Sequence, residues 1–113
     1  MEKEMGYIIA KGPEGLNDVL TSLLKKPERE PCYILYELGS QKSLVKIDMS
    51  EWPFLVWHYD LLGRPATDAM KETLAHFLWE KGGEKEWYLK EYGNALNGDA
   101  AYTAWHHDVF EGR

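Results

Sequence analysis

The chain has 113 residues with a formal net charge of −6, and 44% of its residues are hydrophobic. This length suits one domain, residues 1–113, built as a single α+β unit around one core. No apolar run approaches the roughly 18 residues that a membrane-spanning helix needs. Apart from the short run KKPER, lysine and arginine form no cluster suited to a phosphate backbone, so neither membrane insertion nor nucleic-acid binding is expected.

The beginning of the chain and its single cysteine bear on location and redox chemistry. The opening MEKEMGYIIAKGP lacks the apolar stretch of a secretory signal, so a cytoplasmic location is expected. Cys32 stands alone within an apolar run, and one thiol cannot build a disulfide framework or a cysteine-based zinc motif. Cys32 is therefore predicted to be a small buried hydrophobic side chain, and no cofactor is indicated.

The apolar pattern predicts a strand and then a helix in the first 27 residues. The run GYIIA, residues 6–10, suits a short strand that GPEG ends. In residues 14–27 the spacing puts five apolar residues on one helical face: Leu16, Val19, Leu20, Leu23 and Leu24. Lys25 and Lys26 favour the negative end of the helix dipole, and Pro27 cannot continue the helix.

Three further strands are predicted between residues 31 and 62. The continuous apolar run 31–38 fits a central strand, and residues 44–49 alternate as a half-buried strand does. In residues 54–62 one face carries Leu55, Trp57, Tyr59 and Leu61, and the other carries Phe54, Val56, His58 and Asp60. Short connecting loops predict an antiparallel meander.

The period changes after residue 64, and three helices are predicted. Residues 65–83 carry a continuous apolar stripe, with Pro65 in the first turn and Gly82 and Gly83 at the end. A weaker helix follows in residues 84–98, with Tyr88, Tyr92, Ala95 and Leu96 on one side. Asp99 is a suitable N-cap for a last helix in residues 100–110. The order β-α-β-β-β-α-α-α predicts a two-layer α+β fold, an antiparallel sheet of about four strands packed by one N-terminal helix and a C-terminal helical segment.

Aromatic residues are unusually abundant, with five tryptophans and seven tyrosines. Trp52 lies in a predicted turn, Trp79 lies off the apolar stripe of its helix, and Trp87 opens the next helix. Either neighbouring elements cover these side chains, or they form an exposed surface with Tyr92 and an acidic rim. The second interpretation predicts a non-enzymatic interaction or regulatory module that binds a protein partner or a second copy through its C-terminal helical half. A pocket on the sheet face that carries Phe54 and Val56 is a further hypothesis.

A metal-dependent hydrolase or metal-binding protein is the alternative. The pattern His-x-Asp occurs twice, as His58 and Asp60 and as His106 and Asp108. Residues two apart on a strand share a face, so two such pairs could complete a divalent metal site if they met in space. The second pair, however, lies in a predicted helix, where residues at that spacing diverge. His106 is also expected to lie against Tyr102 and Phe110, four residues away on either side.

Overall fold

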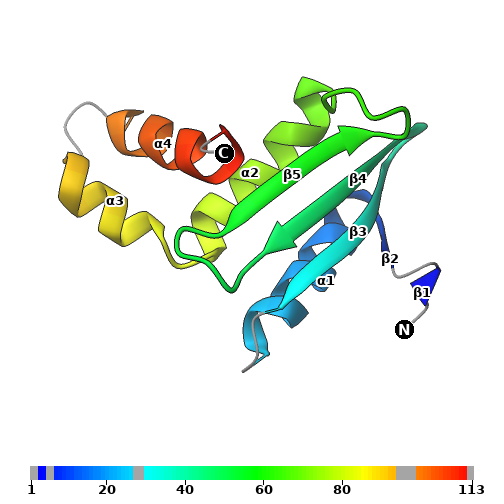
Figure 1. Ribbon diagram of the computed structural model, residues 1–113, viewed down its shortest axis with the longest axis horizontal. Helices are drawn as coiled ribbons and strands as arrows, with labels where there is room; N and C mark the ends of the chain where they lie inside the picture. The colour runs from blue at the N-terminus through cyan, green and yellow to red at the C-terminus, as the bar shows by residue number, and fades with distance from the viewer. Residues whose placement is uncertain (1–2, 5–6, 27–29, 94–98, 112–113) are drawn as a thin grey trace.

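The computed structural model describes residues 3–4, 7–26, 30–93 and 99–111 (Figure 1). The first half contains β1 Lys3–Glu4, β2 Tyr7–Lys11, α1 Gly12–Lys25, β3 Pro31–Leu38, β4 Gln41–Asp48 and β5 Leu55–Asp60. The second half contains α2 Asp68–Lys81, α3 Lys85–Tyr92, α4 Asp99–His106 and a π-helical turn, η2 His107–Glu111. The α+β class and the predicted order of the main elements are confirmed. Ala95 and Leu96 lie outside the described residues.

The sheet has the order β1-β2-β3-β4-β5, and one of its pairings differs from the expectation. β3, β4 and β5 form the predicted antiparallel meander. β2, however, pairs with β3 in parallel, so the sheet is mixed and not wholly antiparallel. The reason is α1, which carries the chain back along the sheet before β3 begins, as a parallel neighbour requires.

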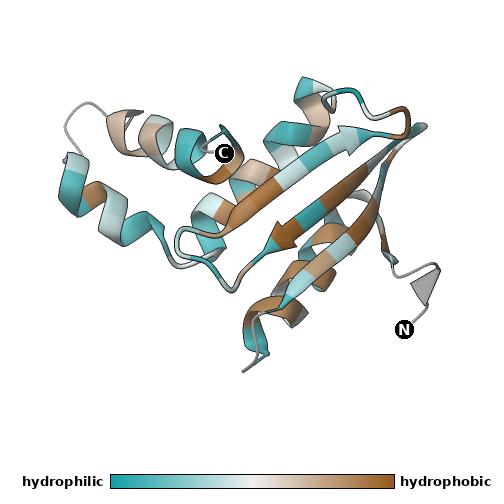
Figure 2. Ribbon diagram, in the orientation of Figure 1, coloured by the Kyte–Doolittle hydropathy of each residue, from teal (hydrophilic) through white to brown (hydrophobic). Residues whose placement is uncertain are grey.

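The helices α1 and α2 cover one face of the sheet and leave the other open. In Figure 1 both helices lie behind the strands, while β3, β4 and β5 face the viewer, and α3 and α4 lie at the β5 side. Alternate residues of the strands point into this helix-covered layer, among them Ile34, Val45, Ile47 and Val56, which are buried. Figure 2 shows hydrophobic stretches along β3, β4 and β5.

The apolar stripe predicted for the first helix packs as expected, but the second helix is displaced from its prediction. Leu16, Leu20 and Leu23 of α1 are buried, and Val19 and Leu24 pack partly buried against the same core. α2 begins at Asp68 and not at Pro65, because Pro65 forms a bridge with Tyr59 of β5. Cys32 is buried, as predicted. Among the described residues, no helix has the length and apolar character needed to span a bilayer.

Candidate functional site

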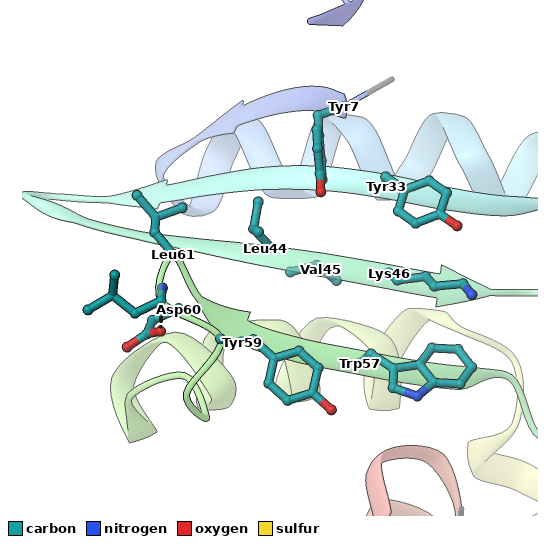
Figure 3. A pocket seen from close by; sticks show the side chains of 11 residues that line it. Tyr7, Tyr33, Leu44, Val45, Lys46, Trp57, Tyr59, Asp60 and Leu61 are labelled. Carbon is teal, nitrogen blue, oxygen red and sulfur yellow. Dashed lines mark hydrogen bonds between the residues drawn. The ribbon is translucent and has the colours of Figure 1, made fainter. Parts of the chain in front are cut away.

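The open sheet face carries an aromatic row with one lysine at its centre. Lys46 of β4 lies directly opposite Tyr33 of β3 and Trp57 of β5 in the strand register. Its ammonium nitrogen is 4.7 Å from the centre of the Trp57 ring and 5.7 Å from that of Tyr33. Tyr7 of β2 extends the row, with its ring edge-on to Tyr33 at a centroid distance of 6.0 Å (Figure 3). Cation–π attraction therefore holds the lysine over the rings.

A second, aliphatic row lies beside the aromatic row. Leu35 pairs with Leu44, and Leu44 pairs with Tyr59. Between these rows and the loop after β5 lies a hollow of about 560 Å³, which we call the sheet hollow (Figure 3). Its volume is within the usual range of ligand pockets, and its lining is mostly apolar and aromatic.

Asp60 fixes the loop that borders the sheet hollow. Its carboxylate accepts hydrogen bonds from the backbone N–H groups of Leu62 and Arg64, at 2.8 and 2.9 Å, and from Nε of Arg64 at 2.8 Å. These hydrogen bonds lower the pKa of Asp60 below its usual value. The bond from the Arg64 backbone has the largest effect, and those from the Arg64 side chain and from Leu62 have smaller ones. The loop then presents Leu61 and Leu62 to solvent, Leu62 with 76% of its surface exposed.

A second aromatic surface joins the β4–β5 loop to α3. We call it the C-terminal aromatic cluster and define it as Trp52, Trp87, Tyr88 and Tyr92. The rings of Trp52 and Trp87 meet edge to face with centroids 5.0 Å apart, and Tyr88 stacks between Trp52 and Tyr92 at 6.1 and 5.9 Å. Trp52, Trp87 and Tyr92 are 56%, 43% and 51% exposed, whereas Tyr88 is buried. Three of the four residues proposed for partner binding therefore share one surface.

Buried polar contacts hold this cluster in place. The hydroxyl of Tyr88 donates to Oδ2 of Asp108 at 2.7 Å. Burial, and then the nearby Asp108 carboxylate, raise the pKa of Tyr88 far above its usual value, so the hydroxyl stays protonated as a donor. Glu84, at the start of α3, accepts hydrogen bonds from the Phe54 backbone N–H at 2.8 Å and from Nε1 of Trp105 at 2.7 Å. These bonds tie the β4–β5 loop, α3 and α4 to one another.

Trp79 does not belong to the exposed surface, contrary to the sequence-based hypothesis. It is only 8% exposed and packs on Tyr102 and Trp105 of α4, with ring centroids 5.4 and 5.2 Å away. Trp79 lies off the stripe of α2 that faces the sheet, but α4 covers the side of the helix that carries it. The last helix thus buries one of the three tryptophans and leaves Trp52 and Trp87 exposed.

The four residues of the proposed metal site do not come together. His58 points into the helix-covered layer, where its Nε2 is 2.7 Å from Oγ of Ser43. Asp60 is engaged by Arg64, and Asp108 by Tyr88. His106 stacks on Phe110 with ring centroids 4.7 Å apart. Within residues 3–4, 7–26, 30–93 and 99–111 no group of three or more histidine, cysteine, aspartate or glutamate side chains is placed to hold a metal ion.

His58 and His106 do share a small hollow of about 200 Å³, but Lys71 also lines it. A lysine ammonium there opposes the binding of a cation. Burial, together with the charge of Lys71, lowers the pKa of His58 to about 4. Neutral His58 is therefore a hydrogen-bonding core residue in the folded chain.

Acidification is expected to destabilise the fold through His58. A histidine whose folded pKa is about 4 takes up a proton more readily when unfolded, so stability is lost as the pH falls from about 6.5 towards 4. Between pH 7 and pH 5 this residue should lower the free energy of unfolding by about 2 kcal/mol. Burial also lowers the pKa of His106, which adds a loss in the same direction.

Urea unfolding of the protein and of His58→Gln at the two pH values measures this contribution. The glutamine variant should lose less stability on acidification, whereas His107→Gln, at an exposed site, should behave like the unchanged protein. Equal losses for the protein and for His58→Gln would contradict a buried neutral histidine.

The open sheet face escaped the sequence analysis, although a signal for it was present. Aromatic residues stand at outward positions of two strands, Tyr33 in β3 and Trp57 and Tyr59 in β5, and alternate with buried neighbours. The sequence cannot tell which face of a sheet helices will cover. The pocket hypothesis accordingly chose the wrong face, since Phe54 and Val56 are buried in the core.

Comparison of the chain with models of protein families, with curated proteins and with solved structures finds no match. Its candidate sites are therefore the sheet hollow and the C-terminal aromatic cluster, as the geometry of the chain itself defines them.

Proposed function

We propose that this chain is a non-enzymatic interaction module that binds a protein partner through the C-terminal aromatic cluster. The observation that carries the proposal is the exposure of Trp52, Trp87 and Tyr92 side by side on a support of buried polar contacts. Tryptophan and tyrosine are the residues that most often dominate protein interfaces, since they bury a large area with few rotatable bonds. The rigid support lowers the entropy lost on binding.

The charges around the cluster favour a basic partner segment. Glu51, Glu86 and Glu91 are adjacent in sequence to Trp52, Trp87 and Tyr92, and all three glutamates are exposed. Lys90 is the exposed cation of α3, while Lys85 is paired with Glu80 at 3.1 Å. Arginine suits such a surface best, because its planar guanidinium stacks on aromatic rings and pairs with carboxylates at the same time.

Titration with an arginine-rich peptide tests this proposal. We expect a nona-arginine peptide to bind, measured by isothermal titration calorimetry, more tightly than a nona-lysine peptide of equal charge. Trp52→Ala and Trp87→Ala should each weaken binding about tenfold or more, as truncation of an interface tryptophan does. Both side chains are exposed, so the variants should stay folded.

Two controls separate stacking from simple charge attraction. Tyr33→Ala alters an exposed aromatic residue on the open sheet face and should leave the affinity for the peptide unchanged. A nona-glutamate peptide should not bind. Equal affinities for arginine and lysine peptides, or binding that is indifferent to both tryptophan variants, would refute the proposal.

A further inference from the structure

A second interaction surface lies on the open sheet face, distinct from the C-terminal aromatic cluster. Tyr33 and Tyr59 are each 43% exposed there, and Leu61 and Leu62 are exposed beside them. An apolar face of this kind, spread over several strands, marks an interface more often than bare surface. We propose that it is where two copies of this chain pack sheet on sheet about a two-fold axis.

The net charge of the face fits a second copy. Five charged residues point outward on this face, three lysines and two acids: Lys11, Lys42, Lys46, Glu37 and Asp48. Their formal charges sum to +1. The whole chain carries −6, so this face escapes the repulsion that two acidic surfaces would meet.

The placement of these charges also sets the orientation of the dimer. At one end of the sheet Glu37 pairs across the strands with Lys11 and with Lys42, and at the other end Asp48 lies between Pro31 and Leu55. A two-fold axis that lies in the interface and crosses the strands at right angles puts one end of the sheet over the opposite end of its copy. Asp48 of each copy then faces the end with two lysines, and an isologous interface satisfies this contact twice.

The same operation brings the apolar side chains of the two faces together. It places Tyr33 over Leu35 of the other copy and Lys46 over Leu44, while Trp57 comes over Tyr59. Apolar and aromatic side chains of the two copies thus meet at the centre of the interface. Leu62 lies beyond the end of β5, so it comes over the opposite end of the other copy, towards its Leu55 and Asp48.

The size of the face predicts a weak dimer. Four strands about 4.8 Å apart, with about seven residues each at about 3.3 Å, cover roughly 440 Å² before the relief of the side chains is counted. This is below the roughly 800 Å² per partner of a standard interface, so we expect a dissociation constant on the order of tens of micromolar.

Sedimentation equilibrium from about 10 µM to about 1 mM tests the dimer across this range. We expect the mass to rise from monomer to dimer with concentration. Leu62→Glu and Tyr33→Lys should each weaken association by about tenfold or more. The lysine at position 33 buries a charge opposite an apolar side chain, and the glutamate at position 62 comes towards the Asp48 carboxylate of the other copy. Both sites are exposed in the monomer, and circular dichroism verifies that each variant is folded.

Two further variants locate the interface. Trp52→Lys, at an equally exposed aromatic residue of the C-terminal cluster, should leave the dissociation constant unchanged. Lys46→Met removes the ammonium from the centre of the face and should strengthen dimerisation by about tenfold, since that charge no longer loses water on association. If the face instead binds an acidic partner or an anionic ligand, Lys46→Met should not strengthen dimerisation.

Three outcomes would overturn the proposal. The first is a monomer at every concentration. The second is a dimer that Trp52→Lys disrupts and both sheet-face variants leave intact. The third is a dimer that Lys46→Met weakens. None of them bears on binding of the arginine-rich peptide, so the two proposals fail independently.

Discussion

Glu84→Ala is expected to lower the free energy of unfolding by about 3 kcal/mol, although Glu84 is a charged residue in an acidic chain. The side chain is only 2% exposed, and each carboxylate oxygen accepts a hydrogen bond from a buried donor. Alanine leaves the Phe54 backbone N–H and the Trp105 indole N–H without acceptors, at about 1–3 kcal/mol each, while the relief of a buried charge offsets part of the loss. Urea unfolding followed by circular dichroism measures the difference.

The pH dependence of a milder variant, Glu84→Gln, tests the same bonds. Glutamine has one acceptor oxygen, so it satisfies one donor and should lose about 1 kcal/mol at neutral pH. Burial raises the pKa of Glu84. The folded chain therefore holds this proton more tightly than the unfolded chain, and the part of the stability that depends on the bound proton is lost as the pH rises through the folded pKa of Glu84. The glutamine variant should lack this decline.

Glu80→Ala is the matched control, because Glu80 is an exposed glutamate whose partner is Lys85. A surface ion pair contributes less than about 1 kcal/mol, so this variant should unfold nearly as the unchanged protein does. Similar losses for Glu80→Ala and Glu84→Ala would show that the two bonds of Glu84 contribute little.

Trp79→Ala is expected to cost about 4 kcal/mol of stability, as truncation of a packed core aromatic residue does. Its indole fills the space between α2 and α4 and contacts Tyr102 and Trp105. Such a loss is a large part of the total stability of a small domain, so Trp79→Phe, at about 1–2 kcal/mol, provides a variant that stays folded. Denaturant midpoints of both variants measure these losses.

Trp52→Ala is the control for the core role of Trp79, since both change tryptophan to alanine. Trp52 is more than half exposed, so the expected change is below about 1 kcal/mol. The reverse order, with Trp52→Ala the more destabilising variant, would refute the division between the buried tryptophan and the exposed cluster.

Local pattern was enough to predict most of the secondary structure. The stripe from Leu16 to Leu24 fits only a helix with one buried face, and the alternation of Val45, Ile47 and Lys46 fits only a half-buried strand. The aromatic richness of the C-terminal half also correctly drew attention to Trp52, Trp87 and Tyr92 as candidates for an exposed surface. In each case the information lies in neighbours within a few residues of one another.

Tertiary structure decided the parallel pairing, which aromatic side chains are buried and which are exposed, and that the two His-x-Asp pairs form no common site. β2 pairs in parallel with β3 because α1 crosses back, and α4 covers Trp79 yet not Trp87. His58 faces the helices while Asp60 binds Arg64 at the end of the strand. The sequence alone determined which faces of the elements are apolar, because periodicity is local. Only the tertiary structure decided which of these faces are covered, because covering one requires a segment far along the chain, and α1 and α2 both pack on the same side of the sheet.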